Sequence, residues 1–331
     1  MHFSKAAVLV LVANIAQAQR PENTSICDYY TAALLEDNTA DNQATLLTLV
    51  VNTVVIGNYT EPNVGVKVSG ILAPGQYNGT DVNLLPYFTG EFASSNRGGD
   101  HGVSINFLDD GGVEPLKNNM PSNTQSSSQY FLLTHLYRFF GSLLGCSQQG
   151  MPGFDVYSGH ASMYEVHKFM ALDPNEVGYF ITQVGLAASS FGVADSDVQA
   201  VGAALISLFG YRCAPLTTVI ESQGPQLQAI CIDDACPLAE EGTCDSYDPV
   251  VEPSSTPSSG STSIIPTASY SSGYPWTTPT PVGTKSATST GSLEMGSGTL
   301  SSPTTIPTAG ASTNGLGLGA VAGGVAALLL W

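Results

Sequence analysis

Apolar residues recur at helical spacing in several stretches of this chain, which predicts a mainly α-helical domain. The clearest stretch is Tyr157–Phe191, in which two helix starts follow each other. Ser162 is followed three residues later by Glu165, as in a capping box, and Asp173 precedes Pro174, which suits a first helical turn. We therefore predict two capped amphipathic helices here.

The same periodicity predicts further helical segments on both sides of this stretch. Gln129–Leu144 repeats apolar residues on one face, and a last helix starts at Asp195 and stops at Gly210. Gln43–Ile56 also has a helical apolar stripe, although its valine-rich second half fits a buried strand as well, and we favour the helix. A shorter amphipathic stretch, Cys27–Leu35, precedes it.

Between these segments the sequence is rich in turn-forming residues. Asn58–Asn106 is loop-like, with short strands predicted at Val64–Ile71 and Val82–Leu85. Asp109–Gly112 is typical of an Asp-Gly turn, and the alternative is calcium binding, for which the ligand spacing of an EF-hand loop is absent. Asn118–Ser128 is a polar linker. The predicted fold class is thus a single helical domain with a loop-rich N-terminal third.

Changes in composition divide the chain into four regions. Residues 1–18 have the basic start, apolar core and small-residue cleavage site of a secretory signal peptide. Residues 19–245 form the predicted folded, extracellular domain, which is long enough to bury a substantial core. Residues 246–313 are rich in Ser, Thr and Pro, which predicts a disordered, O-glycosylated stalk.

The fourth region, residues 314–331, is an uncharged tail of small and apolar residues. It lacks the basic flank of a membrane-spanning helix, so we favour the signal for a glycolipid (GPI) anchor over a transmembrane span. Small residues just before it place the attachment at Asn314 or Gly310. The predicted location is extracellular, on the cell membrane through this anchor or in the cell wall.

Secretion determines how the six cysteines are interpreted. Their even number and the oxidising compartment predict three disulfide bonds, whose pairing stays open. These cysteines are Cys27, Cys146, Cys213, Cys231, Cys236 and Cys244. A zinc site at the last three is the alternative, but no histidine follows them. Three N-x-S/T sequons predict N-linked glycans at Asn23, Asn58 and Asn78.

The chain is strongly acidic, with 27 acidic residues, 9 basic residues and a formal charge of −18. Because it has no basic patch, we exclude nucleic acid as a partner and expect the membrane, through the lipid anchor, and cell-wall glycans. The sequence has no nucleophile elbow, H-E-x-x-H, P-loop or strand-associated dinucleotide motif. We therefore assign no catalytic residue and leave open whether the protein is an enzyme.

Two histidines fall on apolar helix faces. His167 shares the buried stripe of its helix with Met163 and Met170, and His135 lies on the apolar face of the helix at 129–144. The simpler interpretation is a hydrogen-bonded core histidine, because one imidazole completes neither a closed metal site nor a catalytic triad.

A resemblance to a known family gives His167 a second interpretation. The pattern Tyr-x-Gly-x3-Met-x3-His-x2-Met-x-Leu spans Tyr157–Leu172, and a long amphipathic helix, Phe191–Val193 and a final helix reaching Arg212 follow it. Upstream, Tyr137–Phe140 precedes Leu143. Residues 129–212 resemble truncated haemoglobins around their haem-binding histidine, and the upstream segment is similar to that family's early helix.

This resemblance implies a globin-like second half, with His167 as the proximal ligand of haem iron. Phe140 aligns with a position at which the family often has a tyrosine for the bound gas, and His135 would supply a second axial ligand. The other residues that the resemblance implies as pocket or core contacts are Met163, Val166, Met170, Phe180, Ile181 and Val184.

The order of signal peptide, cysteine-bearing domain, stalk and tail resembles fungal GPI-anchored cell-surface proteins. Two functional hypotheses follow. The first is a surface-anchored domain that binds haem through His167. The second is a non-catalytic module for wall structure, adhesion or host contact, without a cofactor. A secreted hydrolase that uses carboxylates is a third.

Overall fold

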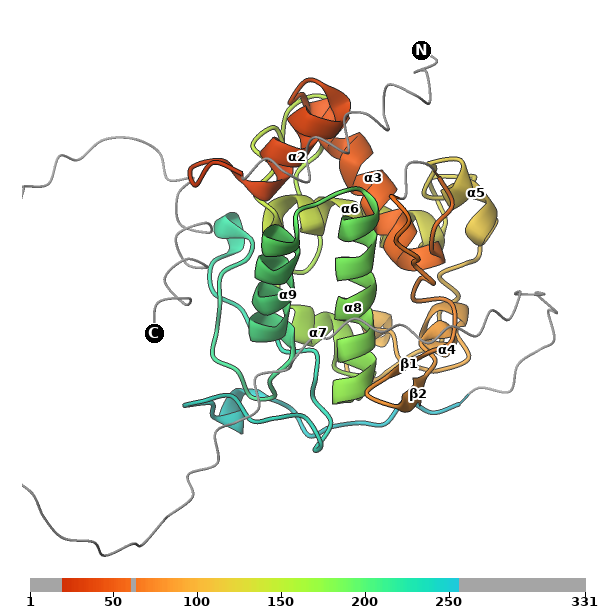
Figure 1. Ribbon diagram of the computed structural model, residues 1–331. Coiled ribbons are helices and arrows are strands. Elements are labelled where there is room, and N and C mark those ends of the chain that lie inside the picture. Colours follow the sequence, from red (N-terminus) through yellow and green to blue (C-terminus); the bar gives the residue numbers. More distant parts are fainter. Residues whose placement is uncertain (1–19, 61–63, 256–331) are drawn as a thin grey trace, which may run out of the picture. The chain divides into compact units, whose positions relative to one another are not determined.

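The computed structural model describes residues 20–60 and 64–255, all within one compact unit (Figure 1). The predictions for the signal peptide, for most of the stalk and for the anchor tail, with Gly310 and Asn314, lie outside these residues. The described part is mainly helical and carries three disulfide bonds, which confirms the predicted fold class at this level. Within it, no helix combines the length and hydropathy that crossing a bilayer requires.

The elements follow each other along the chain with little sheet. The helices are α2 Ile26–Leu35, α3 Ala40–Ile56, α4 Leu85–Thr89, α5 Val113–Lys117, α6 Ser128–Leu143, α7 Met163–His167, α8 Pro174–Ser190 and α9 Asp195–Phe209. The hairpin of β1 Gly75–Tyr77 and β2 Thr80–Val82 and the short 3₁₀ helices η1 Asn96–Gly98, η2 Glu221–Gln223 and η3 Cys244–Ser246 complete the order.

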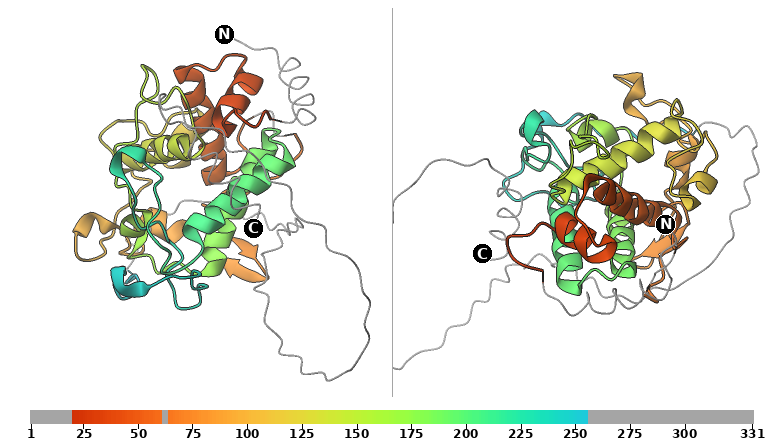
Figure 2. Two further views of the ribbon diagram at one scale, coloured as in Figure 1. Left: turned by 90° about the vertical axis from the view of Figure 1, so that its left-hand side faces the viewer. Right: turned by 90° about the horizontal axis from the view of Figure 1, so that it is seen from above.

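The core forms where α3 packs against both α6 and α8, and where α8 packs along α9 (Figures 1 and 2). Leu47 and Val55 of α3 and Leu133 of α6 are almost fully buried. A buried hydrogen bond joins α3 to α6: the hydroxyl of Tyr137 donates to Oδ1 of Asn52 at 2.6 Å. The helix predicted at Gln43–Ile56 is thus confirmed, because the apolar stripe of a helix fills this core better than a strand would.

Two predicted helix starts are confirmed in detail. Oγ of Ser162 accepts from the backbone N–H of Glu165 at 3.2 Å and begins α7. Asp173 and Glu176 form a reciprocal capping box at the start of α8, with Pro174 in its first turn. The helix from Ser162 ends at His167, however, so α7 is a short element held by its cap and by tertiary contacts.

The predicted strand at Val64–Ile71 is wrong within the described residues. This segment instead lies along the end of α3, where the N–H of Ile71 donates to the carbonyl of Val54 at 2.8 Å. Of the strand predicted at Val82–Leu85, only Val82 is in β2, because Leu85 begins α4 with a proline behind it. The short helices α4 and α5 lie in segments for which the sequence predicts no helix.

The turn at Asp109–Gly112 has a structural role. The carboxylate of Asp109 accepts from the backbone N–H groups of Ser128 and Gln129 at 3.1 and 3.0 Å, at the start of α6. Asp110 accepts from the backbone N–H and the hydroxyl of Thr124. Both carboxylates therefore hold the polar linker against the first turn of α6, as expected of a plain turn.

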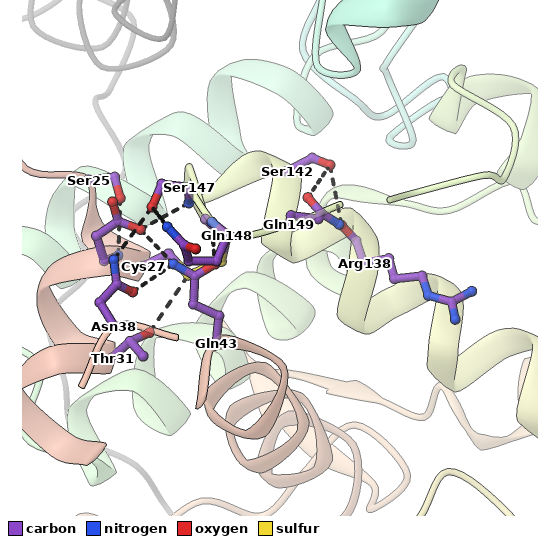
Figure 3. The surroundings of a disulfide bond; sticks show 12 residues. Ser25, Cys27, Thr31, Asn38, Gln43, Arg138, Ser142, Ser147, Gln148 and Gln149 are labelled. Atoms are coloured by element: carbon purple, nitrogen blue, oxygen red, sulfur yellow. Dashed lines mark hydrogen bonds between the residues drawn. A yellow bond between two sulfur atoms is a disulfide. The ribbon is translucent and has the colours of Figure 1, made fainter. Parts of the chain in front are cut away.

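The disulfides pair Cys27 with Cys146, Cys213 with Cys244 and Cys231 with Cys236. The first joins α2 to the chain just after α6, amid the polar side chains drawn in Figure 3. The other two lie in the segment after α9. The chain continues along the domain beyond the predicted boundary at residue 245, because the N–H of Ala93 donates to the carbonyl of Ser254 at 2.9 Å.

Candidate functional site

His167 closes the short helix α7 and has one defined hydrogen bond. Its Nδ1 lies 2.8 Å from the carbonyl oxygen of Met163, one helical turn earlier. A carbonyl oxygen can only accept, so Nδ1 carries the proton in this arrangement. Among the described residues, Nε2 has no hydrogen-bond partner. The geometry therefore leaves the lone pair of Nε2 available to a ligand.

The surroundings of His167 favour its neutral form. Burial lowers the pKa of the imidazole, and the hydrogen bond to Met163 offsets part of this effect. A neutral imidazole with one nitrogen held by a backbone carbonyl is the form in which histidine coordinates metals. The side chain is nevertheless only half-buried, so it keeps accessible surface although protein surrounds it.

Several apolar side chains in α7, in the residues after it and in α8 share this intermediate burial. Val166, Met170 and Phe180 are half-buried, whereas Met163 and Ile181 lie in the core. Val184 is also buried. On α6, Leu132, His135 and Leu136 keep accessible surface as well. The pocket residues that the resemblance implies thus fall into two groups: some are buried in the core, and the others keep solvent-accessible surface with which a ligand could make contact.

The helices that carry the two histidines do not pack extensively on each other within the described part of the chain. In Figure 1, α7 and α6 lie at different heights along α8. The loop with η1 connects them, because Nδ2 of Asn96 donates to the carbonyl of Glu165 in α7 at 3.0 Å. From the next residue, Nη1 of Arg97 donates to Oγ of Ser128 in α6 at 3.1 Å.

His135, on α6, makes the same kind of hydrogen bond as His167. Its Nδ1 lies 2.6 Å from the carbonyl oxygen of Phe131, and the two rings stack with centroids 4.0 Å apart. Burial is the main reason that its pKa is lowered. The ring also packs edge-on against Tyr157, and an added Cβ on Gly159 would lie 2.6 Å from Cδ2 of His135. The Tyr-x-Gly motif therefore fits around this histidine.

Phe140 lies on another face of α6. It follows Leu133 and Tyr137 at helical spacing, and the hydroxyl of Tyr137 bonds to Asn52 of α3. We therefore place Phe140 in the core toward α3, 5% to 7% exposed together with its neighbour Phe139. Among the described residues, no hydrogen bond or ring contact links Phe140 to His167; the ring of Phe140 packs edge-on against Phe139.

The three predicted glycosylation positions differ in exposure. Asn23 and Asn78 are exposed, and Asn78 stands at the tip of the β1–β2 hairpin with a positive φ of 50°. Asn58 is half-buried, and its Oδ1 accepts from the N–H of Val68 at 2.6 Å. Its Nδ2, the atom that would carry a glycan, takes no part in that bond.

Two features near the surface could not be assigned from the sequence. The η1 loop has no periodic pattern, and its only signal is an arginine in a chain with 9 basic residues. The second feature is a pocket of about 300 Å³ near the Cys213–Cys244 bond. Its lining includes Tyr164, Arg212, Asp234, Tyr247 and Val250. The described residues hold no cluster of three or more metal-ligating side chains.

Comparison with known proteins identifies no relative of this chain. No family model matches the chain, and neither the curated proteins nor the solved structures contain a significant match.

Proposed function

We propose that this protein binds haem, with His167 as the ligand of the iron. The observation that carries the proposal is the 2.8 Å contact between Nδ1 of His167 and the carbonyl of Met163. It fixes the tautomer in which Nε2 can coordinate, and a haem iron requires as few as one ligand from the protein because the porphyrin supplies the others.

The residues around His167 fit such a group chemically. Val166 and Met170, which lie beside His167 in the chain and keep accessible surface, would offer apolar contacts to a porphyrin ring. By the family resemblance, Phe180 of α8 would be a further contact. Burial keeps the imidazole neutral, and a neutral imidazole is the form that binds iron. His135 on α6, whose Nδ1 is held by a backbone carbonyl in the same way, would be the candidate for a second ligand of the iron.

We further propose that the second half of the domain is globin-like. The support is the order of elements: α6, a short α7 ending at the histidine, then the long pair of α8 and α9. Bound haem would supply an iron able to bind small ligands. The carbonyl of Met163 would orient the imidazole of His167, and apolar side chains nearby would exclude water from the iron.

We also propose that the protein is secreted and held at the cell surface by a glycolipid. Three disulfides in the described domain support an oxidising compartment, and two exposed sequons support glycosylation. The stalk and tail composition supports the anchor.

Replacing His167 with alanine is expected to abolish or strongly shift the Soret band of the secreted, haem-supplemented protein, because the iron loses its Nε2 ligand. Absorption spectroscopy of the full-length chain after titration with haemin measures this. His101→Ala is the matched control, since His101 is 69% exposed and paired with Asp100. His135→Ala should alter the spectrum only if this residue is an axial ligand. A wild-type protein that binds no haemin contradicts the proposal and favours the non-catalytic surface module.

Treatment of intact cells with phosphatidylinositol-specific phospholipase is expected to release the protein into the medium, because the lipid would be its only attachment to the membrane. Immunoblots of medium and membrane fractions measure the release. Retention in the membrane fraction with an anchored control protein released would contradict the anchor.

A further inference from the structure

The pocket of about 300 Å³ in the segment after α9 is built from parts of the chain that are fixed against each other. The hydroxyl of Tyr247 donates to the carbonyl of Ala214 at 2.6 Å, and the ring of Tyr247 packs edge-on against that of Tyr164 in α7, with centroids 4.6 Å apart. The hydroxyl of Tyr164 accepts from the backbone N–H of Asp248 at 2.7 Å. These bonds preorganise the walls of the pocket, which keeps the entropic cost of binding a ligand low.

The lining of this pocket has an apolar part and a charged part. The apolar surface comes from Ile232, Pro249, Val250 and the Cys213–Cys244 bond, beside the two tyrosines. The charged groups are those of Arg212, Asp234 and Asp248. A ligand that fits this lining must therefore offer both apolar surface and hydrogen-bonding groups.

The charged groups of the pocket keep hydrogen-bonding capacity for a ligand. Nε of Arg212 donates to the carbonyl of Cys236 at 3.1 Å, which orients the guanidinium. Nη1 of Arg212 lies 3.6 Å from Oδ1 of Asp234, beyond hydrogen-bond distance, and the side chain of Asp234 is 96% exposed. Asp248 accepts from Lys168 through Oδ2 at 3.0 Å. Among the described residues, no hydrogen bond occupies the Nη atoms of Arg212 or the carboxylate of Asp234.

The charges in and around the pocket decide which class of ligand fits. Two carboxylates line it together with one guanidinium, and the whole protein carries a charge of −18, so an anion is repelled. A cation would leave the donors of Arg212 unpaired. A hydroxyl both donates and accepts, so it suits the guanidinium and the carboxylates alike. Neighbouring hydroxyls on a sugar ring offer such groups in pairs, and the C–H groups of the ring offer apolar surface.

We propose that this pocket binds one ring of a neutral saccharide. Arg212 donates to the hydroxyls of the ring, Asp234 accepts from them, and the ring lies against Tyr247 and Val250. The volume is at the lower end of the range of about 300 to 1,000 Å³ for small-molecule sites, which suits a single ring with the rest of the sugar chain outside. This inference goes beyond haem binding and does not rest on it, because His167 does not line the pocket.

Isothermal titration calorimetry of the full-length protein with three neutral hexasaccharides tests the proposal and identifies the source of the ring. The sugars are hexamers of β-1,3-linked glucose, of α-linked mannose and of β-1,4-linked N-acetylglucosamine, and at least one should bind. Asp234→Ala and Arg212→Lys should each weaken that binding about tenfold, as for loss of a hydrogen bond to a charged group. Arg212→Lys keeps the charge but loses the planar pair of donors.

Asp245→Ala is the matched control and should bind like wild type, because Asp245 is an exposed carboxylate of the same segment that lies outside the lining. A hexamer of galacturonic acid, which is similar in size but anionic, should bind more weakly than the neutral sugar. Tighter binding of this anionic hexamer would overturn the charge argument and with it the proposed ligand class.

Two further outcomes would overturn the proposal. The first is that wild type binds none of the three neutral hexasaccharides. The second is that Asp234→Ala binds like wild type, since a side chain this exposed can be removed without disturbing the fold. His167→Ala should bind the saccharide like wild type, so failure of the saccharide site and failure of the haem proposal are measured separately.

Discussion

Replacing Cys27 and Cys146 together with alanine should lower the free energy of unfolding by about 5 kcal/mol, because their bond closes a long loop. The two cysteines are 119 residues apart, and the bond joins α2 to the chain just after α6. Without it the unfolded chain gains the entropy of that loop, whereas the native contacts around it remain. Chemical denaturation of the purified protein, followed by far-UV circular dichroism, measures the change.

The Cys231–Cys236 bond is the control within the same chain. Its cysteines are only 5 residues apart, so the same argument predicts a loss of about 2 kcal/mol for the double alanine variant. The polar network in Figure 3 remains in the first variant: Nε2 of Gln43 donates to Asp28 and Asn38 at 2.7 Å each. Equal losses for both pairs would contradict the loop-entropy argument and place the effect in the native state.

Gly70→Ala should cost on the order of 3 kcal/mol or more, because a methyl group there would overlap backbone atoms that cannot move aside. Gly70 has a φ of 81°, and an added Cβ would lie 2.3 Å from the backbone nitrogen of Gly57 and 2.6 Å from the carbonyl oxygen of Val55. The N–H of Gly70 also donates to Oε1 of Gln183 in α8 at 3.0 Å. The substitution would therefore force apart the end of α3 and the backbone at residue 70, which is bonded to α8. Thermal unfolding of the variant measures the loss.

Gly79→Ala is the matched control for this effect. Gly79 has nearly the same φ, 80°, but an added Cβ would have no neighbour within 4 Å. Its cost should be limited to the backbone strain of a left-handed residue, about 1 kcal/mol. If the two variants unfold at the same temperature, the close approach of the two backbone segments does not contribute to stability.

The assignment of His167 and the position of the η1 loop depend on different levels of structure. His167 was identifiable from sequence because it interrupts an apolar stripe and follows a recognisable pattern. Its available Nε2 was not, because that depends on which carbonyl the other nitrogen meets. Arg97 lies in a loop whose place between α6 and α7 is set by contacts over 31 and 69 residues of chain, which no local pattern records.

The helices could be predicted because their evidence is local. Apolar spacing and capping residues such as Ser162 and Asp173 act within a few residues, so α6, α8 and α9 agree with prediction. The strand predicted at Val64–Ile71 is wrong because a valine-rich sequence is compatible both with a strand and with an irregular segment that packs along the end of a helix. Within it, Val68 bonds to Asn58, and the N–H of Ile71 donates to the carbonyl of Val54; only the packed structure supplies those partners.

By itself the sequence determined the mainly helical class, the helix starts and the presence of three disulfides, because periodicity, capping and an even cysteine count are properties of the chain alone. The tertiary structure decided which cysteines pair, that the carboxylate of Asp109 accepts from backbone N–H groups in the first turn of α6, and that Phe140 is buried in the core. It also decided that η1 connects the two histidine-bearing helices. These outcomes depend on contacts between residues far apart in the chain. Such contacts are set by which helix faces pack against each other, and no local sequence pattern specifies that choice.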